Sequence, residues 1–379
     1  MEAVKLEKEK IREELLKLKS ENNFRSLKEF DGKEINFSSN DYLGITQDKK
    51  LLEEFYSKYK PRLSSSSSRL MSGSYKEVME LEKKAEEIYK KPCIVFNSGF
   101  DANSSIIETF YGKNSLIITD RLNHASIYEG IINSRAEIRR YKHLDMENLE
   151  EILKKYSGKY SDILVVCETI YSMDGDITPI KEITELKKKY NFSLMIDEAH
   201  SYGVYGYGMA YNFNLVKDID FLVIPLGKGG GSVGAFVFCE KILKEYIINK
   251  SRKFIFTTAL PPVNHLWNLF ILNKMESKEF DVKRKELFKR IDFTLKKLKE
   301  KGIKTNSASH IISVVTGDNR KIIKIEKNLR EKGYFIYGVK EPAVPKNTAR
   351  FRISLNPEIS FKNIENFIEE LKYELDTVF

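Results

Sequence analysis

One lysine stands in surroundings that suit covalent chemistry. Lys228 follows the apolar run FLVIP at 221–225 and has glycines on both sides, in the order FLVIPLGKGGGSVGA. Burial lowers the pKa of an amine, so a lysine placed there becomes nucleophilic near neutral pH and can form a Schiff base. A phosphate-binding P-loop is excluded, because Leu222 stands where its first glycine would be and Gly229 replaces its Ser/Thr. One lysine is weak support for Schiff-base chemistry by itself, so the residues that would lie near Lys228 must be considered with it.

Carboxylate and imidazole groups follow other apolar runs of the kind that form buried strands. Asp197 and His200 follow SLMI, Glu168 follows ILVVC, and His124 lies shortly after SLIIT. An acid at such a position is poorly solvated and suits a functional site, although a helix cap or a turn residue has the same pattern. A ring at His124 could lie flat against a flat cofactor, and a capping or core histidine is the alternative there and at His200. The histidines without such a placement are interpreted as structural: His143, His265 and His310.

A helix start and a turn lie beside these groups. Ser98, Gly99 and Phe100 come directly after the run CIVFN and open a helix. Backbone N–H groups at such a start can bind a phosphate, and an ordinary strand-to-helix turn is the alternative. Ser172 lies in ETIYSMDGD, whose residues 174–176 are interpreted as a turn. A lysine, an acid and a phosphate-binding helix start after neighbouring strands together fit a pyridoxal 5′-phosphate (PLP) site.

Two arginines near the C-terminus could bind a substrate carboxylate. Arg350 and Arg352 flank Phe351 in ARFRISL, and the alternation of side chains along a strand places both arginines on one face. An arginine can hold a carboxylate through two parallel hydrogen bonds, whereas a surface salt bridge is the ordinary alternative.

The elements that must position these residues alternate between strand and helix. Helical stretches such as 145–156 and 180–190 separate short β-rich runs, which lie at 94–97, 116–119, 163–168, 193–197, 220–224 and 234–238. Runs such as ILVV and FLVI are apolar without alternation, which is typical of strands covered on both faces. The pattern predicts an α/β fold with a mostly parallel sheet, and ligands of such sheets bind beyond the carboxyl ends of the strands.

The texture of the sequence changes near residue 262, where a long helical stretch to residue 301 leads into a smaller set of helices and strands. We therefore predict an N-terminal arm at 1–45, a large α/β domain at 46–261 and a small C-terminal α+β domain at 262–379. The arm begins with an amphipathic helix, whose apolar stripe is Val4, Ile11, Leu15 and Leu18.

Composition bounds the class of protein. The 379 residues are 41% hydrophobic and 31% charged, which suits two or three packed units and excludes a disordered or fibrous chain. No apolar run reaches the roughly eighteen residues that a membrane-spanning helix needs. The charged start MEAVKLEKEK lacks the apolar core of a signal peptide, so we expect a cytoplasmic protein. The cysteines lie far apart, which argues against disulfides and a zinc site: Cys93, Cys167 and Cys239.

The net charge of +9 comes mainly from lysines in helices that also carry glutamate, as in 76–91. Such mixed faces are typical of solvated helix surfaces. Nucleic acid binding is therefore the least favoured interpretation, although the excess charge could attract an anionic small substrate.

Eight motifs occur in the order seen in one enzyme family. They are FSSNDYLG (37–44), SRLMSG (68–73), DRLNHASI (120–127), YSMDGD (171–176), IDEAHSYGVYG (196–206), LGK (226–228), FIFTTALPP (254–262) and TARFRISL (348–355). From about residue 20 to the C-terminus, the chain thereby resembles the α-oxoamine synthases. These are fold-type-I PLP enzymes that condense an amino acid with an acyl thioester. GDN (317–319) and EPAVPKNTARFRISL are most similar to the branch that makes 8-amino-7-oxononanoate for biotin.

The resemblance implies a large domain with a seven-stranded, mostly parallel sheet, and a role for each matching residue. Lys228 would hold PLP as a Schiff base and then act as base and acid at the substrate Cα, while Asp197 would pair with the pyridinium nitrogen. His124 would stack on the cofactor ring and His200 would bond its phenolic oxygen. The other implied residues are Ser98, Gly99 and Phe100 at the phosphate, Glu168 and Ser172 in the cofactor pocket, Thr257 reaching the phosphate from the neighbouring subunit, and Asn40 and Arg352 at the substrate carboxylate. The role of Thr257 implies a homodimer with shared active sites, and no metal ion is implied.

The chain departs from the family pattern near the phosphate and the substrate entrance. The family usually has Ser or Thr three residues before the lysine, whereas Pro225 has neither a hydroxyl nor an N–H. The other replacements are Ser64, Ser66 and Ser67 for glycines, Val78 for a histidine, and 229–231 (GGG) for a more ordinary KAxG. These changes bear on phosphate binding and on substrate specificity more than on the use of PLP.

The resemblance implies the decarboxylative condensation of L-alanine with pimeloyl-CoA or a pimeloyl-carrier protein, which gives 8-amino-7-oxononanoate, CO2 and a free thiol. The alternative is another α-oxoamine synthase, similar to 2-amino-3-ketobutyrate CoA ligase, which would use glycine or serine and a different acyl thioester. A PLP-binding protein that has lost catalysis is a further interpretation, for which Pro225 is the sign.

Overall fold

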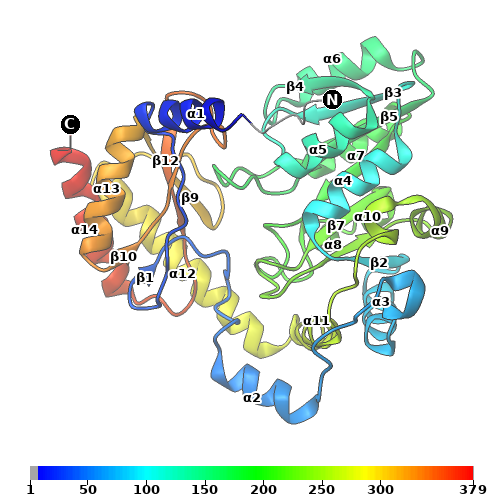
Figure 1. The fold of residues 1–379 in the computed structure, drawn as a ribbon, viewed down its shortest axis with the longest axis horizontal. Helices are drawn as coiled ribbons and strands as arrows, with labels where there is room; N and C mark the ends of the chain where they lie inside the picture. The colour runs from blue at the N-terminus through cyan, green and yellow to red at the C-terminus, as the bar shows by residue number, and fades with distance from the viewer. Residues whose placement is uncertain (1–6, 379) are drawn as a thin grey trace. The chain divides into compact units, whose positions relative to one another are not determined.

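The computed structural model describes residues 7–378, and the chain divides into two compact units (Figure 1). The large unit comprises 40–172 and 176–287, and the small unit comprises the described residues before 40, Met173–Gly175, and the described residues from 288 on. These bounds differ from the divisions predicted after residues 45 and 261. Helix α12 (Lys278–Glu300) runs unbroken through the division at 287, so the sequence has no turn signal there.

The large unit is built on a seven-stranded sheet with the strand order β2-β8-β7-β6-β5-β3-β4. Strand β8 runs antiparallel to both of its neighbours, and all other neighbouring strands are parallel. The strands are β2 (Cys93–Phe96), β3 (Ser115–Asp120), β4 (Glu137–Tyr141), β5 (Asp162–Glu168), β6 (Ser193–Asp197), β7 (Phe221–Pro225) and β8 (Ala235–Phe238). The predicted fold, with its mostly parallel seven-stranded sheet, is thereby confirmed.

Burial follows the sequence pattern along most of the sheet. Every residue of β7 is buried, as an unbroken apolar run predicts for a strand covered on both faces. Strand β4 was missed, because its sequence EIRRY is charged and only its last residue is fully buried. It lies at the edge of the sheet, where charged side chains reach water and help to block pairing with other chains.

Helices pack against the sheet and against one another (Figure 1). Helices α4 (Gly99–Phe110) and α5 (Ala125–Ser134) approach so closely that a Cβ atom on Gly130 would lie 2.8 Å from the Ser104 backbone. Their apolar side chains join those of the strands in one core, which includes Ile106, Ile127, Leu164 and Val223. The other helical segments of this unit are α2 (Lys49–Lys58), a π-helix (Arg69–Gly73), α3 (Lys76–Tyr89), α6 (Met146–Tyr156), α7 (Ile180–Lys189), α8 (Met209–Asn212), a 3-10 turn (Val216–Asp218), α9 (Lys241–Lys250), α10 (Arg252–Ile255) and α11 (Pro262–Lys274).

The observed helices differ from the predicted ones at two points. The single stretch expected at 262–301 is two helices, because the chain turns at 275–277 between α11 and α12. The N-terminal helix is present as α1 (Lys8–Ser20), which buries none of its residues. Val4 of its predicted stripe lies outside the described residues.

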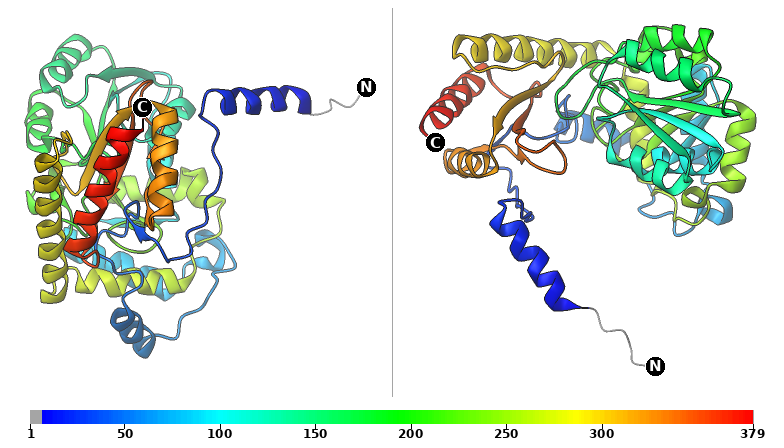
Figure 2. Two further views of the ribbon diagram at one scale, coloured as in Figure 1. Left: turned by 90° about the vertical axis from the view of Figure 1, so that its left-hand side faces the viewer. Right: turned by 90° about the horizontal axis from the view of Figure 1, so that it is seen from above.

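The small unit contains a three-stranded antiparallel sheet in the order β11-β12-β9 and a parallel pair, β1-β10. Helices α13 and α14 lie side by side in this unit (Figure 2). The elements are β1 (Ile35–Asn36), β9 (Ile311–Gly317), α13 (Asn319–Glu331), β10 (Tyr334–Phe335), β11 (Gly338–Val339), β12 (Ala349–Ser354) and α14 (Phe361–Thr377). Strand β12 carries both arginines of the ARFRISL motif.

Candidate active site

A cavity of about 240 Å³ lies at the carboxyl edge of the large sheet. Strands β2, β3, β5, β6 and β7 all end at this edge, because β8, which separates β2 from β7, is the one strand that runs the other way. The residues that line the cavity are Asn40, Ser98, Gly99, Phe100, Asn103, His124, Ser126, Glu168, Asp197, Ala199, His200, Pro225, Gly227, Lys228, Val233 and Gly234. Nine of the twelve site residues predicted from the sequence are therefore brought together here.

Asp197 is held as an acceptor by two donors. It is the last residue of β6 and is only 4% exposed. Asn103 of α4 donates from Nδ2 to Asp197 Oδ2 at 2.6 Å, and the Ala199 N–H donates to Oδ1 at 2.7 Å. Asn103 is 1% exposed, and its Oδ1 has no hydrogen-bond partner among the described residues. A reversed amide would place oxygen against oxygen, so the contact with Asp197 fixes the orientation of Asn103.

His124 is placed as a neutral ring. It caps α5, where its Nδ1 accepts the Ser126 N–H at 3.2 Å, and Ser126 Oγ lies 2.8 Å from the same nitrogen. A nitrogen that accepts carries no proton, and burial lowers the pKa of His124 although Asp197 opposes this effect. Ser126 Oγ also accepts from Asn103 Nδ2 at 3.0 Å. A chain of hydrogen bonds therefore joins His124 to Asp197.

Glu168 holds the backbone of the same loop. Its Oε1 accepts the His124 N–H at 2.6 Å, and burial raises the pKa of Glu168 to about 8, with the nearby Asp197 charge as the second cause. Glu168 is thus a buried carboxyl whose bonded oxygen fixes the position of His124. The sequence had placed it in the pocket without this contact.

His200 is bonded to a tyrosine from the N-terminal motif. Tyr42 is fully buried, and its hydroxyl lies 2.7 Å from His200 Nδ1 and 3.1 Å from Asn40 Oδ1. The motif FSSNDYLG thus reaches the cavity through Asn40 and supports His200 through Tyr42.

Close packing explains the glycines beside Lys228. A Cβ atom on Gly229 would lie 2.1 Å from the Tyr202 carbonyl oxygen, and one on Gly230 would lie 2.7 Å from the Leu226 carbonyl oxygen. Larger residues would push this loop away from its neighbours. The glycine run therefore sets the course of the backbone that carries Lys228 into the cavity lining.

Pro225 packs against the start of α4. A Cβ atom on Gly99 would lie 2.6 Å from Pro225 Cγ, so the proline ring fills the space beside this glycine. Ser98 caps the helix by accepting the Asp101 N–H at 3.0 Å, and its hydroxyl donates to Asp101 Oδ2 at 2.8 Å. The N–H groups of the first helical turn, which include Gly99 and Phe100, have no partners within the helix.

The remaining predicted residues lie elsewhere. Ser172 and Thr257 belong to the large unit but do not line the cavity, and Asn97 Nδ2 donates to Thr257 Oγ1 at 3.2 Å. Arg352 lies on β12 of the small unit, where its Nη1 donates to Ser354 Oγ at 3.1 Å. Arg350 forms an ion pair with Asp174, within the same unit.

The sequence did not point to Asn103, Ser126 or Tyr42. The only available signal for Asn103 was the run of three polar residues, NSS, in the middle of α4, where all three residues are buried. Its partners come from α5 and β6, and a single sequence does not display such distant contacts.

No helix of residues 7–378 is long and apolar enough to cross a membrane. In the same part of the chain, no group of His, Cys, Asp and Glu residues could hold a metal ion. All three cysteines are buried, and burial raises the pKa of each thiol.

Known proteins resemble the chain over most of its length. The profile of the aminotransferase class I and II family matches residues 32–371. An 8-amino-7-oxononanoate synthase of Chlorobaculum parvum is 37% identical over 342 residues, which are 87% of each chain.

Two solved structures are also similar. The structure of 8-amino-7-oxononanoate synthase from Francisella tularensis has a TM-score of 0.75 and 29% identity, over 91% of this chain and 99% of that one. A serine palmitoyltransferase from S. paucimobilis, with a bound PLP-myriocin aldimine, has a TM-score of 0.86 and 28% identity, over 97% of each chain. The chain therefore belongs to the aminotransferase class I and II family, and within it to the α-oxoamine synthases, which are PLP-dependent acyltransferases.

Proposed function

We propose that this chain condenses L-alanine with a pimeloyl thioester to give 8-amino-7-oxononanoate, CO2 and the free thiol, with PLP held in the cavity by Lys228. The observation that carries the proposal is the meeting of Lys228, Asp197, His124 and His200 in one cavity at the carboxyl edge of the sheet. The relatives named 8-amino-7-oxononanoate synthase support the choice of substrates.

The cavity fits PLP by the chemistry of its groups. Asp197 presents a buried carboxylate that already accepts from Asn103 and Ala199, and such a carboxylate suits a protonated ring nitrogen. Lys228 lies in the same lining and can bind an aldehyde covalently. When bound, PLP supplies an electron sink for the negative charge that develops at the substrate Cα.

Each of the chain's own residues in the cavity then has a distinct proposed role. Lys228 would hold the cofactor and would take and return the proton at the substrate Cα. Asp197 would pair with the ring nitrogen, and Asn103, which donates to Asp197, would keep that carboxylate in place. The neutral ring of His124 would stack on the cofactor. His200, which is bonded to Tyr42, would bond the phenolic oxygen, and Glu168 positions the His124 backbone.

The start of α4 would hold the phosphate. Its unpaired N–H groups at Gly99 and Phe100, together with the Ser98 turn, line the cavity. Pro225 offers no donor there, so these backbone groups carry more of the binding than in relatives with a hydroxyl at this position. Thr257 of a second copy is proposed as a further phosphate contact, which implies a homodimer with shared sites, and Ser172 as a more distant support of the pocket.

Arg352 is the better candidate for the substrate carboxylate. Arg350, the other arginine of the motif, forms an ion pair with Asp174, and this pairing supports the choice of Arg352. Asn40, in the cavity lining, would provide a second contact. We propose a cytoplasmic enzyme, since biosynthesis from CoA or carrier-protein thioesters takes place there.

A second candidate is an α-oxoamine synthase with another pair of substrates, glycine or serine with a different acyl thioester. The similarity to serine palmitoyltransferase, with its TM-score of 0.86, favours this possibility. A different specificity would arise at the replaced residues, which are Ser64, Ser66, Ser67 and Val78.

Product analysis separates the two candidates. The purified protein is given PLP with each pairing of alanine, glycine or serine with pimeloyl-CoA, acetyl-CoA or palmitoyl-CoA, and the products are identified by mass. We expect 8-amino-7-oxononanoate from alanine and pimeloyl-CoA, and no product from the Lys228→Ala variant. A faster reaction with another pair would assign the second candidate, and no product from any pair would contradict both.

A further inference from the structure

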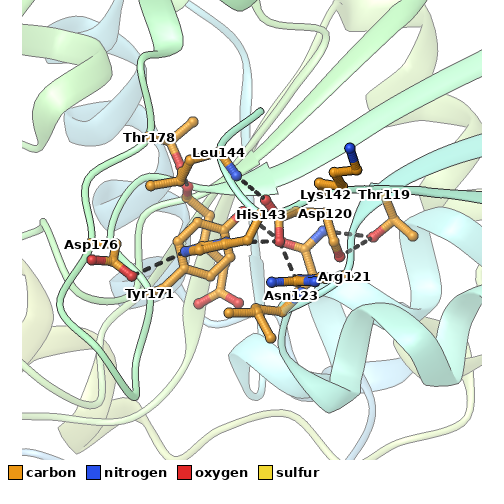
Figure 3. Close-up of polar contacts among 12 residues, drawn as sticks. Thr119, Asp120, Arg121, Asn123, Lys142, His143, Leu144, Tyr171, Asp176 and Thr178 are labelled. Atoms are coloured by element: carbon orange, nitrogen blue, oxygen red, sulfur yellow. Dashed lines mark hydrogen bonds and ion pairs between the residues drawn. The ribbon is translucent and has the colours of Figure 1, made fainter. Parts of the chain in front are cut away.

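His143, interpreted from the sequence as structural, has a carboxylate at each ring nitrogen. Its Nδ1 lies 2.9 Å from Asp120 Oδ1, and its Nε2 lies 3.1 Å from Asp176 Oδ2 (Figure 3). Ionised carboxylates only accept hydrogen bonds, so both ring nitrogens must donate. A histidine that donates from both nitrogens carries a positive charge. His143 is therefore a cation between two anions.

Asp120 connects this cation to the loop that carries His124. It is the last residue of β3, is 0% exposed, and also accepts the Leu122 N–H at 2.8 Å and the Leu144 N–H at 3.1 Å. A buried carboxylate without a cation is costly. His143 supplies that cation, and the charged Asp120 can then fix the backbone at Leu122, two residues before His124.

Asp176 connects the same cation to the turn after β5. The Tyr171 N–H donates to the Asp176 carbonyl oxygen at 3.0 Å, and the Tyr171 ring meets the His143 ring edge-on at 4.4 Å. The Tyr171 hydroxyl donates to Asn123 Oδ1 at 3.3 Å, and Asn123 directly precedes His124. The turn at 171–176 thus contacts the His124 loop by two routes (Figure 3).

We propose that His143 is a positioning residue, a charged tie that holds the loop at 121–124 to the turn at 171–176 and thereby keeps His124 in the cavity lining. The tie deepens the proposed function, on which it rests for the role of His124. Its charge state and its contacts can be tested whether or not the proposed function is correct.

The surroundings favour the charged form of His143. Burial opposes the charge, but the two carboxylates outweigh burial and raise the pKa of His143 to about 9. The tyrosines nearby are neutral near pH 7, since burial raises the pKa of Tyr171 and of Tyr141. The other titratable or charged groups close to the tie are Arg121, Lys142, Tyr128, whose hydroxyl donates to the Asp120 carbonyl oxygen, and Glu168.

Two variants and one control test the tie. Asp176→Asn weakens one end and leaves the His143–Asp120 pair intact, so this variant is expected to fold. His143→Gln removes the cation altogether. Asp145→Asn is the matched control, because Asp145 caps α6 by accepting the Asn148 N–H at 2.8 Å and pairs with Lys142 at 4.0 Å, and neither contact involves His143, Asp120 or Asp176. Asparagine caps a helix about as well as aspartate, so this variant removes a nearby carboxylate charge and leaves the contacts of His143 in place.

The first readout uses the protein without PLP. Nitrogen-15 NMR of the histidine side chains, with His143 assigned from the signals missing in His143→Gln, should find both ring nitrogens protonated at pH 7.5. The titration should shift to lower pH in Asp176→Asn and stay unchanged in Asp145→Asn. A neutral His143 at pH 7.5 would overturn the proposal.

The second readout is PLP binding, followed by quenching of protein fluorescence and by the visible absorbance of lysine-bound PLP. Loss of one charge-assisted hydrogen bond should raise the Kd of Asp176→Asn about tenfold, and that of His143→Gln further, while Asp145→Asn keeps the wild-type Kd. Wild-type Kd and absorbance in both tie variants would overturn the positioning role. A wild-type protein that binds no PLP would instead contradict the proposed function, and the NMR result would still decide whether the tie exists.

Discussion

Two regions at the same edge of the large sheet use histidine in opposite ways. After β3, His124 accepts at Nδ1 from the Ser126 N–H, and burial lowers the pKa of its ring. After β4, His143 donates to two carboxylates, which raise the pKa of its ring to about 9. The first ring is neutral and lines the cavity, and the second is charged and holds the supporting loops. The atoms that face the two ring nitrogens therefore set the charge and the role of each imidazole.

The largest expected effect is a loss of turnover from a change in the cavity that leaves the contacts of His143 intact. Lys228→Ala removes the group proposed to bind PLP and to move the proton, so turnover should fall by a factor of about 10³ or more. The NMR titration of His143 should not change, since Lys228 takes no part in the tie. Turnover within tenfold of the wild type would show that another group performs this chemistry.

A steric change in the Lys228 loop should have the next largest effect. Gly229→Ala forces a Cβ atom to within 2.1 Å of the Tyr202 carbonyl oxygen, so the backbone must shift. We expect the free energy of unfolding to fall by about 1–3 kcal/mol, as for other overpacked positions, and PLP to bind more weakly. Gly112→Ala is the control, because no atom lies within 4 Å of the new Cβ. Equal stability of the two variants in urea would refute the steric argument.

The pH dependence of stability tests whether His143 is charged. The pKa of His143 is raised from 6.5 to about 9 in the folded protein, so its stabilisation is complete below pH 6.5 and is lost as the pH rises through about 9. His143 alone should lower the free energy of unfolding, measured in urea, by about 3 kcal/mol over this window. Burial raises the pKa of Glu168 and Glu198 as well, and these groups add to the fall in the same direction.

His143→Gln isolates the contribution of the tie to this pH dependence. The variant should be less stable than the wild type at pH 6.5, and the difference should shrink by pH 10. A difference that stays constant with pH would contradict a charged His143.

The smallest expected effect concerns the chain of hydrogen bonds that joins His124 to Asp197. Asn103→Ala removes one donor from Asp197 and one from Ser126, so kcat/KM should fall about tenfold. The pKa of His124 should move up towards its ordinary value, because Ser126 no longer has to donate to His124. Asn249→Ala, which removes an exposed amide bonded to the Glu245 carbonyl oxygen at 2.8 Å, provides the comparison. Identical kinetics of the two variants would rule out a role for Asn103.

The sequence predicted those features that depend on short stretches of neighbouring residues. Unbroken apolar runs predicted the buried strands β5, β6 and β7, and the polar residues that follow them predicted most of the cavity. The charged run of β4 concealed an edge strand. The division of the two units at residue 287 has no sequence signal, because α12 continues through it without a break.

Contacts between distant segments could not be predicted from one sequence. Asn103 bonds Asp197 only because α4 places it against β6, and His143 lies between two carboxylates only because β3 and the turn after β5 bring Asp120 and Asp176 to it. A lone histidine after a charged strand gives no sign of these partners. The interpretation of His143 as merely structural was the reasonable one until its two carboxylates were seen.

The most direct test of the central claim is to find which lysine binds PLP. The protein is incubated with PLP, reduced with borohydride so that any lysine-bound cofactor becomes permanent, and digested for peptide mass spectrometry. The account predicts one modified lysine, Lys228, at a stoichiometry near one per chain, and no stoichiometric modification in Lys228→Ala. Modification of a different lysine, or none above the background of surface lysines, would contradict it.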